Sequence, residues 1–186
     1  TEKDSLGEIN IPIDSYYGTQ TYRALNVYKI SGIKADKDLV EAFIIVKKCA
    51  CLANFRHKAI SEEKKSAIVK ACDEILAGKY CDHIKVDVFN SGAGTSLHMN
   101  INEVIANRAI EILGGEKGNY KIIHPNNDVN LGQSTNDVYP TAMRLAIIKK
   151  NKILFDELKN LINDFKAKAR EFNKIFTSGR THLKDA

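Results

Sequence analysis

The sequence has 186 residues, which is enough for one sizeable hydrophobic core, or for one domain and the start of another. Hydrophobic residues make up 44% and charged residues 27%, as in ordinary globular proteins rather than disordered or fibrous ones. The net charge of +5 comes from scattered basic residues, which excludes a nucleic-acid surface, and no apolar run is long enough to cross a membrane.

The start of the chain is predicted to be irregular, with one short extended piece. Ile9, Ile11 and Ile13 alternate with Asn10 and Pro12, which is the period of a strand. A proline cannot donate to a central strand, so this piece is predicted to lie at a sheet edge.

Three helices are predicted next, because apolar residues recur at helical spacing. The first covers residues 37–59, and the second covers residues 61–77, with Ser61 as its cap and a glycine after its end. The third follows the loop "VFNSGAG" (88–94) and ends at Gly114.

No N-terminal segment resembles a signal peptide, so we expect a cytoplasmic protein whose four cysteines are free thiols. Cys49 and Cys51 are two residues apart in a helical segment and therefore point to different faces, which makes them a poor pair of metal ligands. Neither this pair nor any histidine spacing predicts a metal site, and no cofactor is implied.

The last element is predicted to be one long helix, after an irregular or briefly extended connection at 118–132. It carries one apolar stripe from Ile147 to Phe172 and a second stripe beside it that begins at Ile148. Two adjoining stripes favour a helix surrounded by several neighbours in a bundle, and at more than thirty residues it is roughly 45 Å long. Few segments of this chain match that length, so we expect partners from other subunits or from sequence outside the chain.

Three loops share one chemical pattern: "SGAGTS" (91–96), "QSTND" (133–137) and "SGRTH" (178–182). Each offers hydroxyl groups and backbone amides, the last two also contain a side-chain amide or imidazole, and the first two precede predicted helices. Unpaired backbone N–H groups and the helix dipole make a helix start favourable for an anion. A few such donors can hold a carboxylate, since each bond to a charged group contributes about 1.5–3 kcal/mol.

Helix capping explains the same residues without a ligand. Asn136 or Asp137 is expected to cap the long helix, and Pro140 is tolerated in a first helical turn. The loop at 91–96 is neither a Walker loop nor a dinucleotide-binding fingerprint. Spacing alone therefore leaves two interpretations, a set of caps and an anion site.

Together and in order, four motifs resemble the fumarase/aspartase superfamily across essentially the whole chain. They are "DSYYGTQTYRALNVYKISG" (14–32), "GAGTSLHMNINEVIANRA" (92–109), "HPNNDVNLGQSTNDVYPTA" (124–142) and "GRTHLKDA" (179–186). Within the superfamily, the stretches "YYG", "STNDVYPT" and "RTHLKDA" resemble the aspartate ammonia-lyase subgroup.

The resemblance implies a mainly α-helical fold. Residues 1–138 would form an N-terminal domain with a small β piece, and residues 139–186 would begin the central helical bundle of a homotetramer with shared active sites. The implied reaction is the reversible anti-elimination of ammonia from L-aspartate to fumarate through an aci-carboxylate intermediate. The alternatives are a fumarate hydratase and a natural short module without catalytic activity.

The resemblance also implies roles for residues in the three loops. Thr95, Ser134 and Thr135 would bind the β-carboxylate of the substrate and its dianionic intermediate. Asn136 would orient the amino group, with assistance from Thr95 and His182.

Two further positions follow from the same resemblance. Thr181 would contact the α-carboxylate side of the substrate. His124, Asn126 and Asn127 match a second carboxylate site of fumarases, but fumarases usually carry Asp where this chain has Asn127.

The catalytic serine of the family lies on a Gly-Ser-Ser-x-Met-Pro loop, and these 186 residues contain no such motif. We therefore expect the chain to be an N-terminal portion of the enzyme. It would carry most of the carboxylate-binding donors and be inactive by itself.

Overall fold

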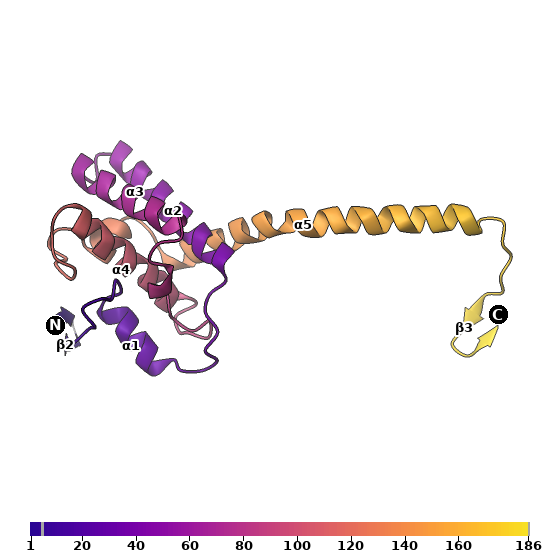
Figure 1. Ribbon diagram of the computed structural model, residues 1–186, viewed down its shortest axis with the longest axis horizontal. Coiled ribbons are helices and arrows are strands. Elements are labelled where there is room, and N and C mark those ends of the chain that lie inside the picture. Colours follow the sequence, from indigo (N-terminus) through magenta and orange to yellow (C-terminus); the bar gives the residue numbers. More distant parts are fainter. Residues whose placement is uncertain (5, 186) are drawn as a thin grey trace. The chain divides into compact units, whose positions relative to one another are not determined.

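The computed structural model describes residues 1–4 and 6–185 of the chain. It contains two compact units, Thr1–Ile147 and Ile148–Ala186, each of which is described by itself. Both are mainly helical, as the sequence predicts, and each has a short β-hairpin, of which the second, at residues 180–185, was not predicted (Figure 1). The long helix α5, Thr135–Phe172, contributes residues to both units, and the domain boundary expected after residue 138 stays a prediction.

The first unit begins with a small antiparallel hairpin of β1, Glu2–Asp4, and β2, Gly7–Ile9. The predicted extended piece enters this hairpin only at Ile9, and Ile13 is exposed. The hairpin is tied to the helix that follows, because the Arg23 guanidinium donates to both carboxylate oxygens of Asp4 at 2.8 and 2.9 Å.

That helix, α1 (Thr19–Val27), was not predicted from the sequence. Its N-cap is Gly18, whose lack of a side chain leaves the first N–H groups without a local acceptor. The buried carboxylate of Glu103 accepts from the backbone N–H groups of Gly18 at 2.8 Å and Gln20 at 2.9 Å. The cap is thus supplied by a residue 85 positions away, which no local pattern reveals.

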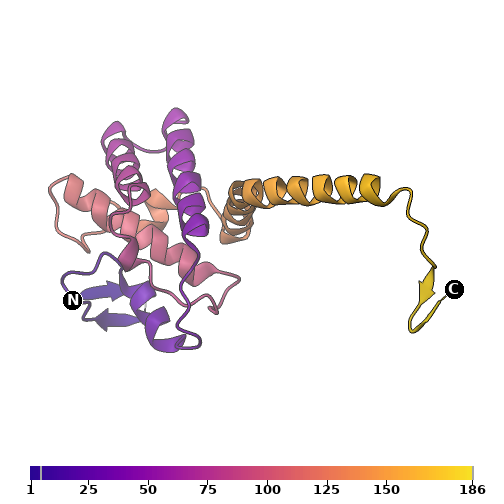
Figure 2. The ribbon, with the colours of Figure 1, turned by 45° about the vertical axis from the view of Figure 1, so that its right-hand side comes forward.

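Helices α2, Lys37–Arg56, and α3, Glu62–Leu76, form an antiparallel pair, as Figure 2 shows. The side chain of Asp36 accepts from the N–H of Asp38 at 2.9 Å, and Ser61 accepts from the N–H of Lys64 at 3.3 Å. The predicted cap of the second helix is confirmed. A short 3-10 turn, Cys81–His83, follows.

Helix α4, Thr95–Ile112, is the centre of the first unit. It packs against α1 and α3, and every residue from Leu97 to Asn107 is buried. Because it is enclosed on all sides, its polar side chains need internal partners. Asn100 illustrates this, since its amide accepts from the N–H of Lys85 at 2.8 Å and donates to the carbonyl of His83 at 2.9 Å.

The connection at 118–132, which was predicted to be irregular or briefly extended, consists of turns and one π-helical turn, Pro125–Val129. His124 supports the turn, because its Nδ1 accepts from the backbone N–H groups of Asn126 at 3.0 Å and Asn127 at 3.2 Å. A side-chain cap of this kind gives no periodic signal in the sequence.

The second unit contains the remainder of α5 and a hairpin of β3, Arg180–Thr181, and β4, Lys184–Asp185. Large apolar side chains of both predicted stripes are exposed here: Ile148, Leu154, Phe155, Leu158, Leu161, Ile162, Phe165 and Phe172. Among the described residues, no helix is both long and apolar enough to span a membrane.

Candidate functional site

The start of α5 is capped by Ser134, not by Asn136 or Asp137. The Ser134 hydroxyl oxygen accepts from the N–H of Asn136 at 3.2 Å, and its carbonyl accepts from the N–H of Asp137 at 3.1 Å. The expectation that Asn136 or Asp137 would cap the helix was therefore wrong, because the helix begins at Thr135. The side chains of Thr135 and Asn136 are not required for capping.

Pro140 is the sixth residue of α5, so it lies in the second turn rather than in the first. A proline has no N–H, and the carbonyl of Asn136 therefore loses the donor that a helix normally supplies four residues later. The helix has an additional acceptor near its start.

The start of α4 has an unusual backbone. Gly92, Ala93 and Gly94 have φ values of +68°, +50° and +90°, so three successive residues are left-handed. An L-residue such as Ala93 costs about 1–2 kcal/mol in this conformation. Strained backbone of this kind is often found at functional sites. The Thr95 hydroxyl donates to the carbonyl of Gly92 at 2.6 Å and holds the loop against the helix.

The starts of α4 and α5 meet directly. A Cβ atom on Gly94 would lie 2.1 Å from Cε2 of Tyr139, so only a glycine allows this approach. One turn further along α4, the Nδ1 atom of His98 lies 2.7 Å from the Thr135 hydroxyl oxygen. Two helix N-termini, both favourable for negative charge, therefore converge on one place.

A cavity of about 430 Å³ lies where these helices meet. It is lined by residues of the loop before α4 and of the first turns of α5: Val88, Asn90, Ala93, Gly94, Thr135, Asn136, Tyr139, Pro140 and Met143. Thr135 and Tyr139 contribute hydroxyls and Asn90 and Asn136 contribute amides, and the rest of the lining is largely apolar. Such a site can orient one end of a small anion.

The predicted site residues are only partly brought together. Thr135 and Asn136 line the cavity, whereas Thr95 and Ser134 are neighbours of the lining residues and are engaged in local backbone contacts. His182 belongs to the second unit, where it is exposed in the β3–β4 turn with φ +52°. The side chain of Thr181 lies outside the described residues.

Two residues behind Thr135 were missed as site candidates. Lys47 of α2 is fully buried, and its Nζ contacts Nε2 of His98, which is also buried. The signal for Lys47 is its position four residues after Phe43, on the buried face of α2. A lysine at such a position requires buried polar partners. His98 gave no comparable signal.

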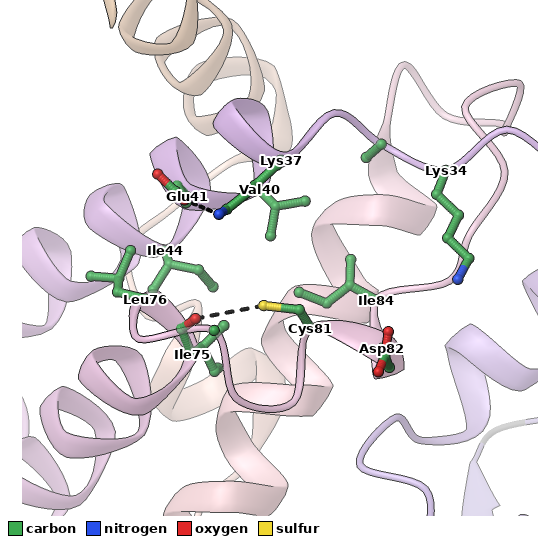
Figure 3. A pocket seen from close by; sticks show the side chains of 12 residues that line it. Lys34, Lys37, Val40, Glu41, Ile44, Ile75, Leu76, Cys81, Asp82 and Ile84 are labelled. Carbon is green, nitrogen blue, oxygen red and sulfur yellow. Dashed lines mark hydrogen bonds and ion pairs between the residues drawn. The ribbon is translucent and has the colours of Figure 1, made fainter.

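A second cavity, of about 260 Å³, is shown in Figure 3. Val40, Ile44 and Ile84 contribute to its aliphatic lining. Lys37 and Glu41 also line it, and Nζ of Lys37 lies 3.8 Å from Oε1 of Glu41. It contains none of the predicted site residues. No group of three or more His, Cys, Asp or Glu side chains suited to a metal ion occurs in the part of the chain that the structure describes.

Comparison with known proteins gives one family. A family model described as lyase matches residues 7–186. The chain is 49% identical to aspartate ammonia-lyase of Bacillus subtilis strain 168 and 45% identical to fumarate hydratase class II of Campylobacter jejuni. Both matches cover 100% of this chain but only 39% and 40% of the respective relatives.

A solved structure confirms the predicted fold. The native form of fumarate lyase:delta crystallin from Brucella melitensis matches with a TM-score of 0.87 and 50% sequence identity. The match covers 100% of this chain and 42% of that chain. The chain thus spans about two fifths of the length of the relatives that it matches.

Proposed function

Because the chain belongs to the fumarase/aspartase superfamily of lyases, we propose that the protein containing it catalyses the reversible anti-elimination of ammonia from L-aspartate to give fumarate. The chain would supply the part of the active site that binds the β-carboxylate. The serine base would come from sequence outside these residues.

The convergence of two helix N-termini on the cavity at Thr135 and Asn136 carries this proposal. Removing a proton from the carbon next to the β-carboxylate places a second negative charge on that group. Fixed donors stabilise such an intermediate most when they are already aimed at the position where the charge develops. The hydroxyl of Thr135, at the start of α5, would fill this role, assisted by Thr95 and Ser134.

The start of α5 also supports an amine as the leaving group. The Asn136 side chain and its backbone carbonyl, which lacks its usual helical donor, would accept hydrogen bonds from an ammonium group. His182 would assist Asn136, and Thr181 would contact the α-carboxylate side. After the C–N bond breaks, ammonia and fumarate leave.

The exposed apolar stripes of α5 support a homotetramer with shared active sites. Contiguous exposed apolar surface is characteristic of a protein interface, and two adjoining stripes suit a helix with several neighbours. Further subunits would bury these side chains. The expected cytoplasmic location also belongs to this proposal.

The direct test is to supply the whole gene product with L-aspartate and, separately, with L-malate. We expect fumarate formation from L-aspartate, with kcat within the usual enzyme range of about 1–10³ s⁻¹. Release of ammonia in equal amount provides an independent measurement. Turnover of L-malate alone would assign the protein to the fumarate hydratases instead.

Fumarate hydratase is the second candidate function, because the identity to that class is only slightly lower. Failure to convert either substrate would favour the non-catalytic module. Measuring the binding of a dicarboxylate by competition separates this case from a misfolded preparation. A non-catalytic module that keeps the cavity would still bind the dicarboxylate, whereas a misfolded preparation would not.

A further inference from the structure

The hydrogen bonds around Lys47 are directed by two amide side chains. Its Nζ donates to Oδ1 of Asn130 at 2.7 Å and to Oε1 of Gln133 at 3.0 Å. The amide nitrogens point the other way, because Asn130 donates to the Gln133 carbonyl at 3.2 Å and Gln133 donates to the Val129 carbonyl at 3.0 Å. Both amides therefore present oxygen atoms to Lys47, and neither can donate to it.

This arrangement links the charge of Lys47 to the direction of the Thr135 hydroxyl. A charged Lys47 has a third proton for Nε2 of His98, which leaves the His98 proton on Nδ1, where it donates to the oxygen of Thr135. The Thr135 O–H is then free to donate into the cavity. A neutral Lys47 instead accepts from Nε2, so Nδ1 is unprotonated and accepts the hydrogen of Thr135.

We propose that Lys47 and His98 form a proton relay that sets the direction of the Thr135 hydroxyl. The cavity offers an O–H donor to a bound carboxylate only when Lys47 carries its proton. Lys47 and His98 are positioning residues, since both act through Thr135. The inference rests on the proposed function, because it takes the bound group to be the carboxylate of a dicarboxylate substrate.

The relay also gives Lys47 a route for its proton. One proton is taken up at the Thr135 oxygen from the cavity, one passes from Thr135 to Nδ1 of His98, and one passes from Nε2 to Lys47. The sum is one proton moved from the cavity to Lys47. The amine itself is fully buried, so this path provides an exchange route that does not require exposing it.

The surroundings place this change near neutral pH. Burial lowers the pKa of Lys47 to about 7, and the nearby Cys72 in α3 stays an uncharged thiol, because burial raises its pKa. Burial and the charge of Lys47 lower the pKa of His98 to about 3, so its ring is neutral and free to exchange tautomers. Among the described residues, the other hydrogen-bond partners of Lys47 are the uncharged amides of Asn130 and Gln133.

A negative charge in the cavity favours the protonated state. The negative charge would stabilise the positive charge of protonated Lys47 through the chain of hydrogen bonds, because such chains polarise cooperatively at low dielectric. The aci-carboxylate, with its extra charge, would gain more than the substrate does. The relay would therefore stabilise the transition state more than the ground state.

The first test needs no enzymatic activity. Solid-state ¹⁵N NMR of the histidine-labelled gene product, followed from pH 5.5 to 9, reports which ring nitrogen of His98 carries the proton. We expect the proton on Nδ1 at low pH and on Nε2 at high pH, with a midpoint near 7. A single tautomer across this range would overturn the relay, whatever the substrate is.

The second test measures kcat/KM against pH for L-aspartate. Because the active state holds the Lys47 proton, kcat/KM should fall as the pH rises through the pKa of Lys47. Lys47→Met should lower the maximum by about 10–100-fold, the range found when outer partners of metal ligands are removed, and should abolish this descending limb. Lys48→Met is the matched control, since Lys48 pairs with Asp73 outside the relay and its loss should leave the profile unchanged.

The outcomes of the two tests are distinguishable. A descending limb that persists in a folded Lys47→Met variant would contradict the relay. Absence of turnover with both L-aspartate and L-malate would contradict the proposed function and leave the NMR result to judge the relay by itself. A Lys47→Met variant that does not fold leaves the NMR titration of the unaltered protein as the deciding measurement.

Discussion

Replacing Thr135 with valine is expected to lower kcat/KM for L-aspartate by about 10²–10³-fold, the loss that follows removal of one donor to a developing oxyanion. Valine keeps the shape of threonine but removes the hydroxyl that lines the cavity. It also leaves Nδ1 of His98 without its partner, which costs on the order of 1–3 kcal/mol of stability. The melting temperature should fall by a few degrees, and steady-state kinetics with thermal unfolding measures both effects.

Two further variants separate catalysis from folding. Thr135→Ser retains the hydroxyl and should keep most of the activity. Thr141→Val makes the same chemical change in the same helix at a residue that does not line the cavity, and turnover should be unaffected. If Thr135→Val lost stability but kept its turnover, Thr135 would be a structural residue only.

Replacing Gly94 with alanine is expected to disrupt the cavity itself. The new Cβ would overlap the Tyr139 ring at 2.1 Å, in a backbone with φ +90°. The left-handed backbone costs about 1–2 kcal/mol and the overlap about 1–3 kcal/mol, so the free energy of unfolding should fall by about 2–5 kcal/mol. Chemical denaturation at fixed protein concentration measures this loss, and activity should fall with it.

Gly114→Ala provides the control for this change. Gly114 also has a left-handed backbone, with φ +79°, but a Cβ there would have no atom within 4 Å. The Gly114→Ala variant should therefore lose only the conformational contribution to its free energy of unfolding, about 1–2 kcal/mol, and keep its activity. If Gly94→Ala and Gly114→Ala lost equal free energies of unfolding, the close contact between the starts of α4 and α5 would not be required for stability.

The sequence was most informative where a pattern is local. The helix capped by Ser61 was predicted because apolar spacing and a cap occur within a few residues, and the long helix was predicted from its apolar spacing. Helix α1 was not predicted, since its first N–H groups are accepted by Glu103, which is remote in the sequence. Local periodicity cannot report an acceptor that arrives through tertiary structure.

The candidate site shows the same division. The polar cluster around Thr135 and the glycines before Thr95 indicated two helix starts, and the structure shows that these starts meet. The sequence did not predict which residue of the cluster caps the helix. Ser134 serves as the cap instead of Asn136 or Asp137. Lys47 and His98 were also not identified, since the contact of Lys47 with His98 and that of His98 with Thr135 depend on the packing of α2, α4 and α5.

In the proposed function, the cavity at Thr135 and Asn136 binds a dicarboxylate. A crystal structure of the whole gene product with succinate, which has no leaving group, tests it most directly. We expect one carboxylate of succinate within hydrogen-bond distance of the Thr135 hydroxyl and the start of α5. Succinate bound only elsewhere, for example beside Lys34 and Lys37 in the cavity of Figure 3, would contradict it.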